Sequence, residues 1–256
     1  MRPGISKAWL TLYLAFAAFF QTANAEAVIN DHTCTVKITK PDGMVLTVDI
    51  KKDRPLPEIS SGSTVEILAG SMEVAPAEGV VQVIARDMVT AVEAGDRITV
   101  MVDTETGMAE YSVSAGGLEV IAGNTTITVG KAQSVQVRSD NMTGIAEVRS
   151  IKGAIRTDTV CVRALIPEHM AAEISIDDAT GEVNVKSADG SIEVSSVDGS
   201  VRKKLSEGET FHMTGCVPAG IQTFTNMTPE VAAPDEDEGP DEFRRKRYYR
   251  FWPLFP

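Results

Sequence analysis

Residues 189–211 read DGSIEVSSVDGSVRKKLSEGETF and show the pattern from which the fold of this chain can be predicted. Short runs alternate polar and apolar residues, as half-buried β-strands do, and acidic-Gly pairs separate the runs. Asp-Gly between such runs is a strong hairpin signal, because a type I′ turn requires positive φ at both central residues. Glycines recur every nine residues, at Gly181, Gly190, Gly199 and Gly208. We therefore predict short antiparallel strands that reverse at each glycine.

Two-residue turns at Asp189-Gly190 and Asp198-Gly199 would fix the register of the strands around them. The expected cross-strand neighbours are Val185 with Val194, Ser187 with Ile192, Ile192 with Leu205 and Glu193 with Lys204. Lys203 would point inward by parity, so a bulge or an edge position is expected for it. The alternative is a parallel solenoid with two nine-residue strands per coil, in which the same Ile and Val positions form ladders.

The N-terminus has the pattern of a secretory signal peptide. Arg2 and Lys7 precede an apolar run of thirteen residues, 8–20, and the small residues Ala23 and Ala25 mark a cleavage site. The run is too short to span a bilayer as a helix. We expect a mature protein that begins at Glu26 and is exported to the periplasm, the cell envelope or the extracellular space.

The chain is acidic and poor in aromatic residues. Its net charge of −12 becomes −14 without the two cations of the signal, and this balance argues against nucleic acid or anionic lipid as the main partner. Between residues 26 and 233 the only aromatic residues are Tyr111, Phe211 and Phe224. The core should therefore be aliphatic.

Three cysteines, Cys34, Cys161 and Cys216, remain after the signal. An exported chain with an odd count can form one bridge. A Cys161–Cys216 bridge would tie the ends of the second half together and leave Cys34 free or available for an intermolecular bridge.

The rest of the body continues the strand pattern. Residues 34–50 read as a hairpin around Pro41-Asp42-Gly43, and no convincing amphipathic helix is present.

Two sequence blocks also recur. Gly70-Ser-Met-Glu-Val resembles Gly190-Ser-Ile-Glu-Val, each with a further glycine nine residues on, and Glu93-Ala-Gly-Asp corresponds to Ser206-Glu-Gly-Glu. We interpret these matches as an internal duplication.

The segment 190–209, with Gly-Ser-Ile-Glu-Val, Asp-Gly-Ser-Val and Leu-Ser-Glu-Gly-Glu in succession, resembles the closing strands of the FecR domain. Residues 65–100 also resemble this domain, but the resemblance is weaker. The FecR domain is the extracytoplasmic β-module of iron-uptake signalling regulators, and the resemblance implies an all-β extracytoplasmic module. This chain has a cleavable signal in place of the regulators' sigma-binding segment and membrane helix. The nine-residue series 180–206 also resembles repetitive β-rich adhesins.

The sequence offers only weak evidence for catalytic or metal-binding residues. The three histidines, His32, His169 and His212, lack metal-ligand spacing, and no Ser or Cys stands in a nucleophile elbow. The acidic pair Asp177-Asp178 and the repeat positions Asp189, Asp198 and Glu207 are explained by turn chemistry, and the calcium β-roll pattern is absent. We predict no catalytic residue, no metal and no cofactor, and hence no enzyme.

The C-terminal tail differs from the body. Residues 234–242 form an acidic block with no apolar period, typical of a disordered segment. A basic-aromatic segment follows, and Arg, Tyr and Trp are the residues that most often dominate binding interfaces. The candidate partner-binding residues are Arg244, Arg245, Arg247, Tyr248, Tyr249, Phe251 and Trp252. Membrane contact is expected only through this tail.

These observations predict an all-β protein of short antiparallel strands. Its expected parts are a signal peptide (1–25), two related FecR-like or solenoid-like β-modules (26–140 and 141–228) and a disordered tail (229–256). The expected function is an exported, non-catalytic binding or scaffolding protein whose partner is an envelope protein or a glycan. The alternative is a repetitive β-rich surface adhesin.

Overall fold

The computed structural model describes residues 24–28, 34–51, 59–140, 142–177 and 179–216. These residues form strands and turns and no helix, so the predicted all-β class is confirmed. No helix in this part of the chain has the length and apolar character needed to cross a membrane. The contacts divide the chain into one unit that ends at Pro218 and a second made of residues 219–256, and the second lies outside the described residues.

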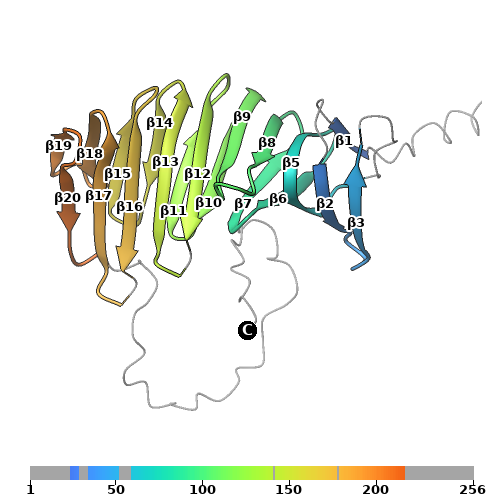
Figure 1. Cartoon of the computed structure of the whole chain (residues 1–256), viewed down its shortest axis with the longest axis horizontal. Coiled ribbons are helices and arrows are strands. Elements are labelled where there is room, and N and C mark those ends of the chain that lie inside the picture. The colour runs from blue at the N-terminus through green and yellow to red at the C-terminus, as the bar shows by residue number, and fades with distance from the viewer. Residues whose placement is uncertain (1–23, 29–33, 52–58, 141, 178, 217–256) are drawn as a thin grey trace, which may run out of the picture. The chain divides into compact units, whose positions relative to one another are not determined.

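The strands form two sheets that share β5 (Figure 1). In order of pairing, sheet A contains β4 (Ile59–Ser60), β1 (Asn24–Val28), the second half of β5 (Thr64–Pro76), β8 (Arg97–Val102), β9 (Ala109–Ala115), β12 (Ser134–Asp140), β13 (Ile145–Lys152), β16 (Ala171–Asp177), β17 (Glu182–Asp189) and β20 (Thr210–Met213). Sheet B contains β3 (Val45–Ile50), β2 (Cys34–Thr39), the first half of β5, β6 (Val80–Ala85), β7 (Met88–Glu93), β10 (Leu118–Ala122), β11 (Thr125–Val129), β14 (Ile155–Asp158), β15 (Val162–Ile166), β18 (Ile192–Ser196) and β19 (Arg202–Leu205). Paired strands are antiparallel except β5 with β6, so the parallel-solenoid alternative is wrong.

Both sheets bury one face against a common core. Burial alternates along the strands, as in β11 and β18, and the buried apolar side chains of the two sheets belong to one cluster. The core is built mainly from Val, Ile, Ala and Met, with Tyr111 and Phe211 as its aromatic members. The predicted aliphatic core is thus confirmed. The module boundary expected after Asp140 falls at the β12–β13 hairpin, where the two strands pair along their length.

The chain reverses differently at the two ends of the strands. Hairpin turns join neighbouring strands of one sheet, for example β8 to β9 and β10 to β11, and we call this end the turn edge. At the opposite end the chain passes from one sheet to the other, for example from β9 to β10 and from β11 to β12, and we call this the crossover edge. From β9 onward the chain alternates between a turn and a crossover.

The same geometry recurs every 37 residues. The crossover glycines Gly79, Gly116, Gly153 and Gly190 are each separated by 37 positions and all have positive φ. The turn glycines Gly107, Gly144 and Gly181 repeat at the same interval. Four coils result, each with one strand in sheet A, a hairpin in sheet B and a second strand in sheet A. The final coil is β17, β18, β19 and β20.

The predicted nine-residue spacing is real, but it marks two kinds of reversal. All four glycines have positive φ, yet Gly181 and Gly199 lie in hairpin turns whereas Gly190 and Gly208 lie in crossovers. The Asp198-Gly199 hairpin is confirmed, with Ile192 opposite Leu205 and Glu193 opposite Lys204. The Asp189-Gly190 hairpin is wrong, because β17 and β18 belong to different sheets. The expected pairs Val185–Val194 and Ser187–Ile192 are therefore absent, and Val185 pairs with Ile174 and Phe211.

One of the two recurring sequence blocks coincides with a recurring local structure, and the other does not. Ser206–Glu209 and Glu93–Asp96 form the same crossover, with equivalent hydrogen bonds from Asp96 N–H to Glu93 O and from Glu209 N–H to Ser206 O. The match between Gly70 and Gly190 is out of register. Gly70 lies where β5 passes from sheet B to sheet A, and the equivalent of Gly190 is Gly79.

Three strands, β1, β2 and β3, bear on predictions made near the N-terminus. The expected hairpin at residues 34–50 is confirmed by β2 and β3, in which Cys34 pairs with Ile50. β1 begins at Asn24, so cleavage after Ala25 would remove its first two residues and leave residues 26–28 paired with β5. Cys34 is free and buried, and burial raises the pKa of its thiol to about 11.

Candidate functional site

A groove crosses the outer face of sheet B in the last two coils. Its volume is about 350 Å³. We call it the arginine groove and define it by Arg156 on β14, Arg163 and Leu165 on β15, Glu193 on β18 and Arg202 on β19. It extends to Gly199 in the β18–β19 turn, so one end of it opens at the turn edge.

Strand alternation places these side chains on the solvent side. Along β14, Arg156 lies between Ile155 and Thr157, which are buried, and along β15 Leu165 lies between the buried Ala164 and Ile166. Cross-strand pairing then sets Arg156 beside Leu165 and Leu165 beside Glu193. In the neighbouring row Arg163 pairs with Ser195, and Ser195 with Arg202. The groove therefore follows from the register of four strands and needs no irregular loop.

Two carboxylates order the arginines of the groove. Asp158 accepts hydrogen bonds from Nε of Arg156 at 2.6 Å and Nε of Arg163 at 2.7 Å, and Glu193 accepts one from Arg202 at 2.6 Å. Partial burial alone would raise the pKa of Asp158, but the two guanidinium groups outweigh it and the pKa is lowered. The hydrogen bond from Arg202 likewise lowers the pKa of Glu193. Both carboxylates thus remain charged well into the acidic range and hold the guanidinium groups in place.

Lys203 is explained by its place on an edge strand. β19 is the last strand of sheet B, and its first three residues, 202–204, are exposed. Lys203 turns towards Glu209, with the two charged groups 3.9 Å apart. Cations along an exposed strand edge discourage pairing with another chain. The edge position expected from sequence is confirmed.

A second set of polar groups lies at the turn edge of sheet A. The sequence Asp-x-x-Thr-Gly occurs at 103–107, 140–144 and 177–181, in three successive turns. The carboxylate of Asp103 accepts the N–H of Glu105 at 2.9 Å, and that of Asp177 accepts the N–H of Ala179 at 2.8 Å. Hydrogen bonds within the turns lower the pKa of all three aspartates, chiefly from the hydroxyl groups of Thr106 and Thr143 and from the N–H of Ala179.

A cavity of about 440 Å³ opens beside these turns. It is lined by Arg86, Arg138, Asp140, Glu147 and several neighbours. Arg86 donates to the carbonyl of Thr104, and Arg138 forms an ion pair with Glu147. With Asp87, three carboxylates and two guanidinium groups line this cavity, so it has one more negative than positive charge.

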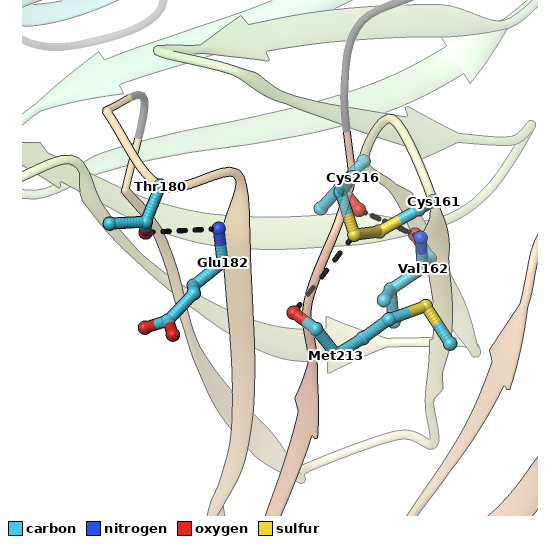
Figure 2. The surroundings of a disulfide bond; sticks show 7 residues. Cys161, Val162, Thr180, Glu182, Met213 and Cys216 are labelled. Carbon is cyan, nitrogen blue, oxygen red and sulfur yellow. Dashed lines mark hydrogen bonds between the residues drawn. A yellow bond between two sulfur atoms is a disulfide. The ribbon is translucent and has the colours of Figure 1, made fainter.

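The disulfide joins Cys161 to Cys216, the pair singled out from the sequence (Figure 2). Cys161 lies in the turn before β15, and Cys216 follows β20, so the bridge connects sheet B to sheet A at the turn edge. The N–H of Cys216 donates to Gly181 O at 3.0 Å, and the N–H of Val197 donates to Cys161 O at 2.8 Å. The bridge therefore gathers three turns of the last two coils.

The structure places four of the other residues considered from the sequence. His212 is exposed and lies 2.6 Å from Oδ1 of Asn184, and His169 occupies a crossover with positive φ. Asp189 forms an ion pair with Arg149 at 2.9 Å. Asp198 accepts the N–H of Ser200 at 3.0 Å, as an Asx turn requires. His32, Asp178 and the candidate partner-binding residues 244–252 lie outside the described residues.

In the part of the chain that the structure describes, no group of three or more His, Cys, Asp or Glu side chains is placed to hold a metal ion. Comparison with protein families, with characterised proteins and with solved structures finds no match to this chain.

Sequence reasoning missed the arginine groove and the three Asp-x-x-Thr-Gly turns. The turns could have been found by comparing the chain with itself at an offset of 37 residues. The groove gives no such signal, because Arg156, Arg163 and Arg202 are brought together only by the pairing of β14 with β15 and of β18 with both β15 and β19.

Proposed function

We propose that this chain is an exported, non-catalytic β-protein that serves as a binding or scaffolding module in the bacterial periplasm or cell envelope. The observation that carries the proposal is the stack of four coils closed by the Cys161–Cys216 disulfide. Stacked repeats offer broad, regular surfaces for binding, and a disulfide persists mainly in oxidising compartments.

Four further features support the proposal. The N-terminus has the composition of a signal peptide, and residues 190–209 resemble a FecR domain, which is an extracytoplasmic module. The outer faces of the sheets carry ordered ion pairs, such as Arg97 with Glu73 and Arg202 with Glu193, and these faces suit a protein or glycan partner. The tail adds a segment rich in Arg and aromatic residues, a composition common at binding hot spots.

The test is a pull-down from envelope extract with the full-length chain and with a chain truncated after Ala233. We expect the full-length protein to be recovered from the envelope fraction, cleaved after Ala25 and oxidised at Cys161 and Cys216, together with a partner that the truncated chain loses. Recovery in the cytoplasm with reduced cysteines would contradict export. Identical partners for the two chains would contradict binding through the tail.

The repeated coil favours a second candidate, a repetitive surface adhesin. Adhesins use stacked repeats to present binding surfaces outside the cell. Protease treatment of intact cells separates the two functions, because an adhesin would be digested and a periplasmic module would be protected.

A further inference from the structure

The first and last strands of sheet B are protected from other chains to different degrees. The last strand, β19, exposes three consecutive cations, Arg202, Lys203 and Lys204. The first strand, β3, reads Val-Leu-Thr-Val-Asp-Ile and contains no proline, lysine or arginine. Cations, proline and very short strands protect a sheet edge, because an unprotected edge pairs with another chain. β3 is therefore the end of sheet B suited to such pairing, and among the described residues it pairs only with β2 (Figure 1).

The hydrogen bonds of the β2–β3 hairpin show which backbone groups face the free edge. The N–H of Lys40 donates to the carbonyl of Met44 at 2.9 Å. Since hydrogen-bonded pairs recur at every second residue of an antiparallel ladder, the even-numbered residues of β3 bond to β2. Val45, Thr47 and Asp49 therefore direct their N–H and C=O groups away from β2. Each of these residues offers one donor and one acceptor to a further strand.

A second copy of β3 can satisfy all of these groups. Opposed residues of an antiparallel pair either both form ladder hydrogen bonds or both do not, so β3 pairs with itself only where the two residue numbers have an even sum. With Thr47 opposite Thr47 of the second copy, Val45 lies opposite Asp49, and every outward-facing residue has a partner. This arrangement is symmetric about Thr47, as a two-fold dimer requires.

The side chains of β3 also fit a second copy. Leu46 and Val48 are only half-buried, and Val48 packs against the core. In the symmetric pair Leu46 of each copy lies opposite Val48 of the other on the core-facing side, so the pairing covers both side chains. On the outer face Asp49, the single charged residue of β3, lies opposite Val45, which is 53% exposed. Like charges of the two β3 strands are therefore not opposed.

The charges that flank β3 are complementary. Asp42 precedes the strand and is held in its turn by a backbone hydrogen bond, and Lys51 follows the strand and is exposed. Continuing the register by one residue places Lys51 opposite Gly43 of the second copy, beside its Asp42. The two-fold symmetry repeats this contact at the other end of the pair. The other cations of the hairpin, Lys37 and Lys40, lie one strand further from the second copy, and Lys37 already forms an ion pair.

We propose that the protein forms a two-fold homodimer in which β3 of each copy pairs antiparallel with β3 of the other, centred on Thr47. The dimer continues sheet B from one copy into the next and covers the β3 edge of both. An isologous contact of this kind closes at two copies and does not propagate into a filament. The inference goes beyond the proposed function and depends on neither export nor the tail.

Sedimentation velocity of the full-length, disulfide-bonded protein tests the proposal. We expect a reversible monomer–dimer equilibrium over a series of protein concentrations. T47E should raise the dissociation constant of the dimer about tenfold, because two like charges then lie opposite each other at the two-fold axis. An equimolar mixture of T47E and T47K should recover dimers, since a glutamate then faces a lysine.

Q82E is the matched control. It adds the same charge to the outer face of sheet B, but on β6, which has a neighbouring strand on each side. Its dissociation constant should equal that of the wild type. T47P is a second disrupting variant, because it removes an N–H that faces the free edge and none that bonds to β2. It should keep the circular dichroism spectrum of the wild type and lose the dimer.

Three results would overturn the proposal. A monomer at every concentration would do so, and would leave the β3 edge to an extended segment of another protein. A dimer that T47E and T47P leave intact, or one linked through Cys34 on a non-reducing gel, would show that the copies associate elsewhere. If T47E weakens the dimer and the mixture with T47K does not recover it, Thr47 does not lie at the two-fold axis.

Discussion

The turn edge and the crossover edge reverse the same chain by different means. At the turn edge Asp103 and Asp177 accept hydrogen bonds from N–H groups two and three residues later, so each turn is stabilised from within. At the crossover edge, local hydrogen bonds such as that from Asp96 N–H to Glu93 O are joined by contacts between residues about twenty positions apart. Ser150 exchanges backbone hydrogen bonds with His169 and Met170.

Two glycines, one from each edge, show the contrast between open and closely packed positions. A Cβ at Gly199, in a hairpin turn, would meet nothing within 4 Å, whereas a Cβ at Gly116, in a crossover, would lie 1.8 Å from Oδ1 of Asp96. Asp96 belongs to the crossover of the preceding coil. The aspartate hydrogen bonds of the turn edge are therefore local, although Gly144 and Gly181 also accept backbone hydrogen bonds from Ile176 and Cys216. The crossover at Gly116 is coupled to the coil before it through the side chain of Asp96. The predictions below test this distinction, beginning with the disulfide at the turn edge.

The disulfide should give the largest effect, because it is a covalent link between two distant segments of the turn edge. It encloses 55 residues, and closure of a loop of this length restricts the unfolded chain by about 4 kcal/mol. We expect C161S/C216S to lower the free energy of urea unfolding by about this amount. Hydrogen exchange should increase mainly in β15 and β17–β20.

Reduction of the wild type provides the control. It should reproduce the loss in stability and should not affect the double variant further. Equal stability of the oxidised and reduced proteins would show that the last two coils do not need the bridge.

The next largest effect should come from Gly116→Ala. The residue has φ of 76°, a conformation that costs about 1–2 kcal/mol for an L-residue. The added Cβ would also displace the Asp96 carboxylate, which accepts N–H groups of Glu93 and Gly117. We expect a total loss of about 3 kcal/mol, since overpacking adds to the backbone strain.

Gly199→Ala is the matched variant, with φ of 74° and open space around the Cβ. It should cost about 1–2 kcal/mol, the backbone strain alone. Hydrogen exchange should rise in two coils for Gly116→Ala and only in the β18–β19 hairpin for Gly199→Ala. If the two variants show the same loss and the same extent of exchange, the crossover edge does not couple the coils.

The local character of the turn edge also explains what could be predicted from the sequence. The hairpins at Asp42-Gly43 and Asp198-Gly199 were predicted correctly, because the residues that form each turn are adjacent in the chain. Asp189-Gly190 has the same dipeptide but forms a crossover. The residues that pair with β17 and β18 are distant in sequence, and a Cβ at Gly190 would lie 1.6 Å from Sδ of Met170, which is twenty residues away.

The arginine groove was beyond sequence reasoning for a related reason. Alternation along a strand predicts which residues are exposed, but it does not predict which strands become neighbours. Arg156 and Arg163 share Asp158 because β14 pairs with β15, and Arg202 joins them only through β18. Once β17 and β18 are assigned to one hairpin, as the sequence suggested, this face cannot be assembled.

The smallest effect should come from the three aspartates of the turn edge, and it should depend on pH. Hydrogen bonds within the turns hold the pKa of Asp103, Asp140 and Asp177 below the usual value of about 3.9. A carboxylate with a lowered pKa in the folded state stabilises the fold above its unfolded pKa, and this stability is lost as the pH falls through the folded pKa. We expect the stability of the wild type to decrease between about pH 5 and pH 2, and that of D103N/D140N/D177N to decrease less.

The control is E78Q/E119Q/E168Q, which removes the same number of charges from exposed positions outside these turns. It separates the effect of the turns from that of net charge. Urea unfolding at a series of pH values should give curves for the wild type and the turn variant that differ at pH 7 and converge towards pH 2. Curves that stay parallel over this range would show that the turns do not depend on the ionised carboxylates. The stability of the turns would then come from the positive-φ glycines, which occur at both edges. The two edges would differ only in the contacts that the crossovers make.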